Sequence, residues 1–139
     1  MKKKDQLILS KYFPEEYLKI TDIIDSKTKI IIRLKSITNK CECPGCKARL
    51  TDYHGTYERK VQDLPILGKN VQLLVNVREY QCENENCSVT TVTESYDGFL
   101  NSYSRMTERC ADFICMLAME TSCEGCARIF SKLLDSEGN

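Results

Sequence analysis

The stretch Cys41-Glu42-Cys43-Pro44-Gly45-Cys46 decides how this sequence is interpreted. A second cysteine loop, Cys82-x₄-Cys87, follows after a spacer of 35 residues. A C-x₂-C turn presents two sulfurs on one side of a bend, and structural zinc takes four tetrahedral ligands. Both pairs lie in polar surroundings rather than on apolar stripes. The sequence therefore predicts one structural Zn²⁺ per chain, bound by Cys43, Cys46, Cys82 and Cys87.

Two other residues compete for the predicted zinc site. Cys41 could replace Cys43 as a C-x₄-C pair with Cys46, and we prefer Cys43 because the Pro-Gly insert suits the tighter turn. His54 is an alternative ligand, but its use would leave one cysteine over. Structural zinc can supply roughly 10 kcal/mol of folding free energy, so we expect loss of any one ligand to unfold residues 18–96.

Strand patterns lie on both sides of the cysteine loops. Residues 18–37 alternate around a turn at 25–28 and predict a β-hairpin. Residues 71–80 predict a strong strand with alternate residues from Val71 to Val77 on one face, and residues 89–96 predict another strand. A polar stretch follows the first cysteine pair, and the segments 63–65 and 67–69 are interpreted as breaks.

The pattern becomes helical after Gly98. Apolar residues recur at helical spacing from Met106 to Leu117 and again from Cys123 to Leu134, and Thr107 and Ser122 suit the helix starts. Cys123 and Cys126 form a C-x-x-C pair that could be redox-active. Because both fall on the apolar stripe, we interpret the four cysteines of this segment as helix residues, mostly in the core: Cys110, Cys115, Cys123 and Cys126.

The predicted fold class is therefore α+β, with a small β-rich, zinc-ribbon-like domain followed by a short helical segment. We predict a lead-in at residues 1–17, the zinc-binding domain at 18–97, a helical pair at 104–134 and a tail at 135–139.

Composition excludes several classes of protein. The chain has 139 residues, with 20 Lys plus Arg and 20 Asp plus Glu, so it is not a uniformly basic nucleic-acid coat. The charge is nevertheless unevenly distributed along the chain: residues 1–60 carry a net charge of +6 and residues 81–139 carry −6. No apolar run approaches the length of a transmembrane helix, and the apolar run after Met1-Lys2-Lys3-Lys4 is too short for a signal peptide. We expect a cytoplasmic protein without a membrane partner, in which nine cysteines favour metal binding over disulfides.

The motifs taken together resemble the N-terminal zinc-finger region of the ISL-three family of insertion-sequence transposases. The resemblance covers about residues 18–134, and at Val92-Thr93-Glu94 the family usually has Phe-x-Glu. The motifs that carry it are Cys43-Pro44-Gly45-Cys46, Tyr53-His54-Gly55, Arg59, Asp63-Leu64-Pro65, Gly68-Lys69 with Val71 and Leu73, Arg78-x-Tyr80-x-Cys82, and Cys87.

The resemblance implies that this chain binds double-stranded DNA at the terminal inverted repeats of a transposon. It identifies the helical pair as a partial helix-turn-helix, in which residues 122–134 are the first or scaffolding helix and the base-reading helix is absent. The family's catalytic domain carries an Asp-Asp-Glu triad, for which this chain has no room, so we expect it not to be an enzyme. We expect the catalytic domain or another transposase copy as a further partner.

Basic residues surround the first cysteine pair in the sequence and are interleaved with tyrosines. Basic side chains neutralise phosphates, and tyrosines can donate to them or stack. The predicted DNA-binding residues are Lys35, Lys40, Lys47, Arg49, Tyr53, Tyr57, Arg59 and Lys60.

Two alternative functions remain at this point. One is a zinc-stabilised protein-interaction module, derived from a decayed or domesticated transposase. The other is a thiol oxidoreductase that uses Cys123 and Cys126, which is the weaker alternative because no thioredoxin-like βαβ pattern precedes the pair.

Overall fold

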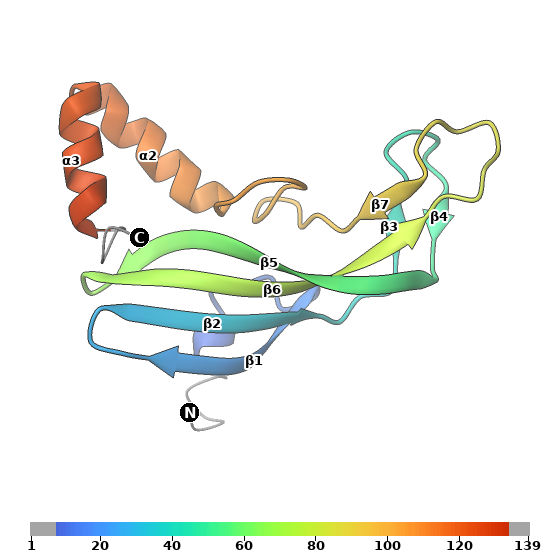
Figure 1. Cartoon of the computed structure of the whole chain (residues 1–139), viewed down its shortest axis with the longest axis horizontal. Coiled ribbons are helices and arrows are strands. Elements are labelled where there is room, and N and C mark those ends of the chain that lie inside the picture. Colours follow the sequence, from blue (N-terminus) through green and yellow to red (C-terminus); the bar gives the residue numbers. More distant parts are fainter. Residues whose placement is uncertain (1–7, 134–139) are drawn as a thin grey trace.

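A computed structural model describes residues 8–133 (Figure 1). Residues 1–7 of the predicted lead-in, Leu134 of the predicted helical pair and the predicted tail 135–139 lie outside the described residues. The predicted α+β class is confirmed, since strands dominate and a helical segment follows them. The elements are β1 (Leu18–Asp25), β2 (Lys29–Ser36), β3 (Cys41–Glu42), β4 (Arg49–Leu50), β5 (Tyr53–Ile66), β6 (Lys69–Gln81), β7 (Thr91–Thr93), α2 (Glu108–Glu120) and α3 (Cys123–Leu133).

The main sheet has the strand order β1-β2-β6-β5. The predicted hairpin is confirmed as β1 and β2, which pair antiparallel, whereas β2 and β6 pair parallel from Lys29 opposite Asn70 to Lys35 opposite Asn76. The short strand β7 pairs with the last residues of β6, from Glu79 to Gln81, beyond the point where β2 ends. It is shorter than the predicted strand at 89–96.

The long strand β5 occupies the polar stretch after the first cysteine pair and runs through the break expected at 63–65, whereas the break expected at 67–69 is the turn that follows it. The strand pairs with β6 over almost its whole length through a two-residue turn, in which Leu67 has φ 50° and Gly68 has φ 82°. Positive φ at both positions is typical of the hairpin turns that match strand twist. The pattern concealed β5 because its inward face carries the polar residues Arg59 and Asp63 on either side of Val61. Pro65 is tolerated because the register shifts between Asp63 and Ile66.

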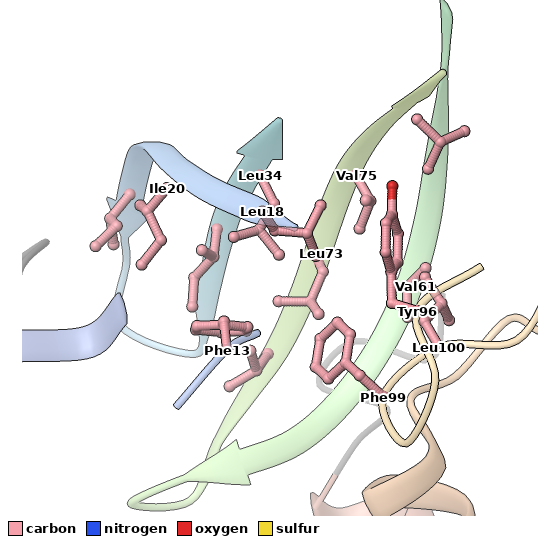
Figure 2. Close-up of a cluster of buried hydrophobic side chains, with 14 residues drawn as sticks. Phe13, Leu18, Ile20, Leu34, Val61, Leu73, Val75, Tyr96, Phe99 and Leu100 are labelled. Atoms are coloured by element: carbon pink, nitrogen blue, oxygen red, sulfur yellow. The ribbon is translucent and has the colours of Figure 1, made fainter. Parts of the chain in front are cut away.

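One face of the sheet carries the main hydrophobic core (Figure 2). The predicted inward face of β6 is confirmed, since its alternate residues from Val71 to Val77 are almost completely buried. Phe13 and the 96–100 segment cover this face, and the rings of Phe13 and Phe99 meet edge to face at 5.8 Å. The buried core residues are Phe13, Leu18, Ile20, Ile23, Ile32, Leu34, Val61, Val71, Leu73, Val75, Val77, Tyr96, Phe99 and Leu100.

The helical pair joins the sheet through the buried carboxylate of Asp63. The Thr107 hydroxyl donates to Asp63 Oδ1 at 2.8 Å, and the Arg109 guanidinium donates to both carboxylate oxygens, at 2.9 Å to Oδ1. Figure 1 shows the helices at one end of the β5–β6 hairpin and the cysteine loops at the other. No helix within residues 8–133 is both long enough and apolar enough to cross a membrane.

Both predicted helix caps are confirmed. Thr107 accepts from the Cys110 amide, and the Ser122 hydroxyl accepts from the Gly125 amide at 3.0 Å. The expectation of mostly buried cysteines is only half right: Cys110 and Cys126 are buried, whereas Cys115 and Cys123 are exposed. The spacing predicted the helices correctly, but these helices have too few neighbours to bury the whole apolar stripe.

Candidate metal centre

The first cysteine pair lies at the tip of a small hairpin made by β3 and β4. The Cys43 amide donates to the Ala48 carbonyl at 2.9 Å, and the Lys47 amide donates back to the Cys43 carbonyl at 2.9 Å. Lys47 has φ 64°, which lets the chain turn back directly after Cys46. This turn directs both sulfurs to the same side, as the C-x₂-C spacing predicts.

The second cysteine pair lies in the loop between β6 and β7. The Cys82 amide donates to the Thr90 carbonyl at 2.9 Å and closes the base of the loop. Asn84 shapes its tip, because its carbonyl accepts from the Cys87 amide and its side chain accepts from the Asn86 amide, both at 3.0 Å. An asparagine that bonds its own backbone two residues on is a common turn device.

The two loops bring four sulfurs together. The sulfurs of Cys43 and Cys87 are 3.7 Å apart, and those of Cys46 and Cys82 are 3.6 Å apart. Disulfide sulfurs would be only about 2.0 Å apart, whereas two sulfurs of a tetrahedral zinc site with Zn–S near 2.3 Å are separated by about 3.8 Å. Within residues 8–133 this is the one group of three or more potential ligands that converges, with all ligand atoms within 4.8 Å. The donor set and its spacing fit one zinc ion.

Gly45 allows the two loops to approach this closely. A Cβ atom at this position would lie 2.8 Å from the Cys87 sulfur and 2.9 Å from Val89 Cγ2. Cβ atoms essentially never approach other atoms this closely, so any larger residue would push the loops apart. The glycine of the Cys-Pro-Gly-Cys motif is therefore needed for its lack of a side chain.

The pKa is lowered for the two thiols of the first cysteine pair and raised for the two thiols of the second. The Ala48 amide and then the Asn84 side chain lower the pKa of Cys46 to about 6, and the Cys46 amide lowers the pKa of Cys43. The Asn84 amide also favours the Cys82 thiolate, but burial and the neighbouring sulfurs outweigh it and raise the pKa of Cys82 to about 12. The pKa of Cys87 is raised in the same way, although the Val89 amide opposes the shift. Four adjacent thiolates repel one another, and a bound divalent cation supplies the compensating charge.

Neither alternative ligand belongs to the converging group. Cys41 is half-buried outside it, where burial, and then the nearby Glu94 carboxylate, raise the pKa of its thiol to about 11. His54 is exposed on β5 and is also outside the group. The four cysteines of the two pairs are the set suited to binding zinc.

A buried carboxylate connects the zinc end with the sheet. Glu94 accepts from the hydroxyls of Tyr80 and Tyr96, at 3.1 and 3.0 Å, and from the Arg78 amide at 3.0 Å. Burial, and then the nearby charge of Glu94, raise the pKa of both tyrosines. Tyr80 packs with the cysteine loops and Tyr96 with the sheet core, so Glu94 joins the two clusters.

The predicted DNA-binding residues do not form a single group. Lys40, Lys47 and Arg49 are exposed at the zinc end, where Lys47 makes an ion pair with Glu42 at 3.8 Å. Lys35 and Lys60 are exposed on the sheet face opposite the main core, as their pairing with Asn76 and Leu74 places them.

The remaining three predicted residues differ in environment. Tyr53 lies under the Arg78 guanidinium, and Tyr57 pairs with Val77 and so lies on the core side of the sheet. The expectation is wrong for Arg59, which is buried and donates to the Asn101 carbonyl at 3.0 Å and to the Ser104 carbonyl. Its charge anchors the segment before α2 and does not reach a surface. Sequence spacing alone did not distinguish it from the neighbouring Lys60.

Comparison with known proteins identifies the cysteine-rich part. Residues 39–87 match the family described as the zinc-finger of transposase IS204/IS1001/IS1096/IS1165, and the match includes both cysteine pairs. Residues 39–87 therefore form a zinc-binding segment similar to the zinc ribbon of ISL-three family transposases. The transposase for insertion sequence element IS1001 of Bordetella parapertussis is 31% identical over 106 residues. That match covers 76% of this chain and 25% of the relative, so the chain spans about a quarter of the length of this relative. No solved structure matches.

The ISL-three resemblance is therefore confirmed, and the chain contains a transposase-type zinc-binding portion. The predicted set leaves out Arg33 and Arg78, which line the same hollow of the sheet as Lys35 and Tyr53. The alternation of Arg33 with Lys35 in the predicted hairpin was an available signal.

Proposed function

We propose that this chain is the DNA-binding portion of a transposase and contacts the terminal inverted repeats of its element. The observation that carries the proposal is the ISL-three zinc ribbon with Lys40, Lys47 and Arg49 exposed around it. Zinc would fix the backbone of the loops beside which these side chains lie, and positive side chains bind phosphates with release of counterions. Such contacts position a protein on DNA without reading its sequence.

We propose that residues 18–97 contact DNA and that the helical pair contacts protein. Met116 and Met119 on α2 are 56% and 84% exposed, and the side-chain hydrogen bonds from this helix to the sheet come from Thr107 and Arg109 at its start. We propose that these residues face a catalytic domain or another transposase copy, and that this chain does not itself cut or join DNA.

The exposed methionines also favour a second candidate function. A contiguous exposed apolar surface commonly marks a protein contact. Under this alternative the chain is a zinc-stabilised protein-interaction module and does not bind DNA.

A titration of zinc-loaded protein with terminal-repeat and scrambled duplexes at two salt concentrations tests the proposal. Weak binding to both is expected, and if about four phosphates are neutralised, log K falls with log salt at a slope of about −3 to −4. Arg49→Ala should weaken binding to all sequences alike and reduce the slope by about one, whereas Cys123→Ser should have no effect. No binding at low salt would favour the protein-interaction module, and tight selective binding would show that the ribbon reads bases.

A further inference from the structure

The sheet has a second face that no element of residues 8–133 covers. The residues of β1, β2, β6 and β5 that point away from the core are mostly polar, and they surround a shallow hollow of about 420 Å³. Within its lining Glu58 is the one acidic residue, and Arg33, Lys35 and Arg78 are basic. The uncovered face therefore has the composition of a binding surface for an anion.

The placement of charge on this face is unfavourable for the sheet by itself. Lys19 on β1 stands directly opposite Lys35 on β2, and the pair of like charges is exposed. Like charges directly opposite each other destabilise a pair of strands. A local cost of this kind is typical of functional surfaces.

The two arginines of the hollow are held in place before any ligand binds. Arg33 donates to Glu58 at 3.1 Å across the sheet, where both side chains are about half exposed. The Arg78 guanidinium donates to the Thr38 carbonyl and stacks over the Tyr53 ring at 4.4 Å from its centroid. Each guanidinium keeps further N–H donors, since one has five in total.

We propose that this open sheet face, including Lys19, Arg33, Lys35 and Arg78, binds the phosphate backbone of duplex DNA. The inference rests on the proposed function and names the surface that carries most of the contact. Lys60 on β5 extends the face on one side, and Thr56, paired with Arg78, adds a hydroxyl donor. The surface continues along β6 toward the zinc end, because Tyr53 pairs with Tyr80 just before Cys82. One duplex can then contact the sheet face first and the ribbon second.

Phosphate contact fits this face better than base readout does. The Tyr53 ring is already occupied by Arg78 on one side and meets Tyr80 edge to face, so it is not a free platform for a base. The remaining groups are cations and hydroxyls, which recognise phosphate oxygens. Glu58 reduces the positive charge of the hollow, and its carboxylate would repel a phosphate that approaches Arg33.

Three variants test the proposal by duplex titration at low salt, with zinc content and far-UV circular dichroism as checks of folding. The face variant Lys19→Ala/Arg33→Ala/Lys35→Ala should bind at least tenfold more weakly, and its salt slope should fall by about two to three. The matched zinc-end variant Lys40→Ala/Lys47→Ala/Arg49→Ala should lose less affinity. Glu58→Gln should bind about threefold more tightly, because it removes the one negative charge of the hollow.

Each remaining outcome overturns a named part of the account. If the face variant binds as the wild type does and the zinc-end variant does not, DNA binding stands and the face assignment fails. If inorganic phosphate displaces the duplex at equal ionic strength, the hollow is a site for a small anion. If the wild type binds no duplex but associates with itself in a salt-sensitive manner, the face binds acidic protein, and the proposed function fails with it.

Discussion

The sheet and the zinc end are stabilised by different means. The sheet buries fourteen hydrophobic side chains in one cluster. The zinc end buries only three residues in its cluster, Cys43, Tyr80 and Val92. Around them lie partly buried residues: Cys41, Cys46, Ala48, Leu50, Cys82, Cys87 and Val89. A cluster of that size cannot offset the conformational entropy of the two loops, so the metal supplies the missing stabilisation. Side-chain burial and metal coordination thus support adjacent parts of one chain.

This difference changes an expectation drawn from the sequence. We expected the loss of a zinc ligand to unfold all of residues 18–96. The sheet core contains none of the ligands, so we now expect loss of order at the cysteine loops alone. Glu94 is the main connection through which damage could spread, because it bonds Tyr80 and Tyr96.

The largest effect is expected from replacing a zinc ligand. Cys43→Ser or Cys82→Ser should abolish stoichiometric zinc binding, since structural zinc supplies roughly 10 kcal/mol to such sites. Metal analysis with X-ray absorption should show one zinc and four sulfurs at about 2.3 Å in the wild type. Cys41→Ser is the matched control and should keep the metal. A nitrogen shell at about 2.0 Å would instead assign His54 as a ligand.

Truncation of a residue in the sheet core should lower the stability of the sheet and leave zinc binding unchanged. Leu73 is completely buried, so Leu73→Ala should lower the free energy of unfolding by about 3 kcal/mol while zinc stoichiometry stays at one. Leu67→Ala at the exposed hairpin turn is the control and should change stability by less than about 0.5 kcal/mol. Urea unfolding followed by circular dichroism measures both. Zinc loss in Leu73→Ala would show that the two regions depend on each other.

A smaller effect is expected at the joint between sheet and helices. Asp63→Asn removes the charge that Arg109 faces and should cost about 2 kcal/mol, reduced from the value for a fully buried pair because Arg109 is partly exposed. Amide exchange should quicken in the first turn of α2 and remain unchanged at the cysteine loops. Unaltered exchange in α2 would mean that the helical pair is held by other contacts.

The smallest effect is expected at the C-x-x-C pair of α3. Cys123 is exposed, so Cys123→Ser should leave the zinc stoichiometry unchanged. It should change the free energy of unfolding by no more than about 0.5 kcal/mol. Metal analysis and thermal unfolding of the variant test this together. A loss of zinc would show that this pair contributes to a metal site.

Sequence patterns predicted local features better than long-range ones. The cysteine spacing predicted the zinc ligands, and alternation predicted β1, β2 and the inward face of β6, because each signal lies within a few consecutive residues. The strand β5 was not predicted because the polar residues Arg59 and Asp63 lie on its inward face. Their hydrogen-bond partners come from residues 101–109, which are distant in the sequence. The parallel pairing of β2 with β6 and the open sheet face also depend on contacts between distant segments, which no local pattern contains.

Amide hydrogen exchange before and after removal of zinc by a chelator tests most directly whether two separate means of stabilisation act in this chain. We predict that protection is lost in residues 41–50 and 82–92 and retained in β1, β2 and the paired part of β5 and β6 from residue 56 to 77. Simultaneous loss of protection throughout the sheet would contradict the account and show that the zinc ion holds the whole β-rich region together.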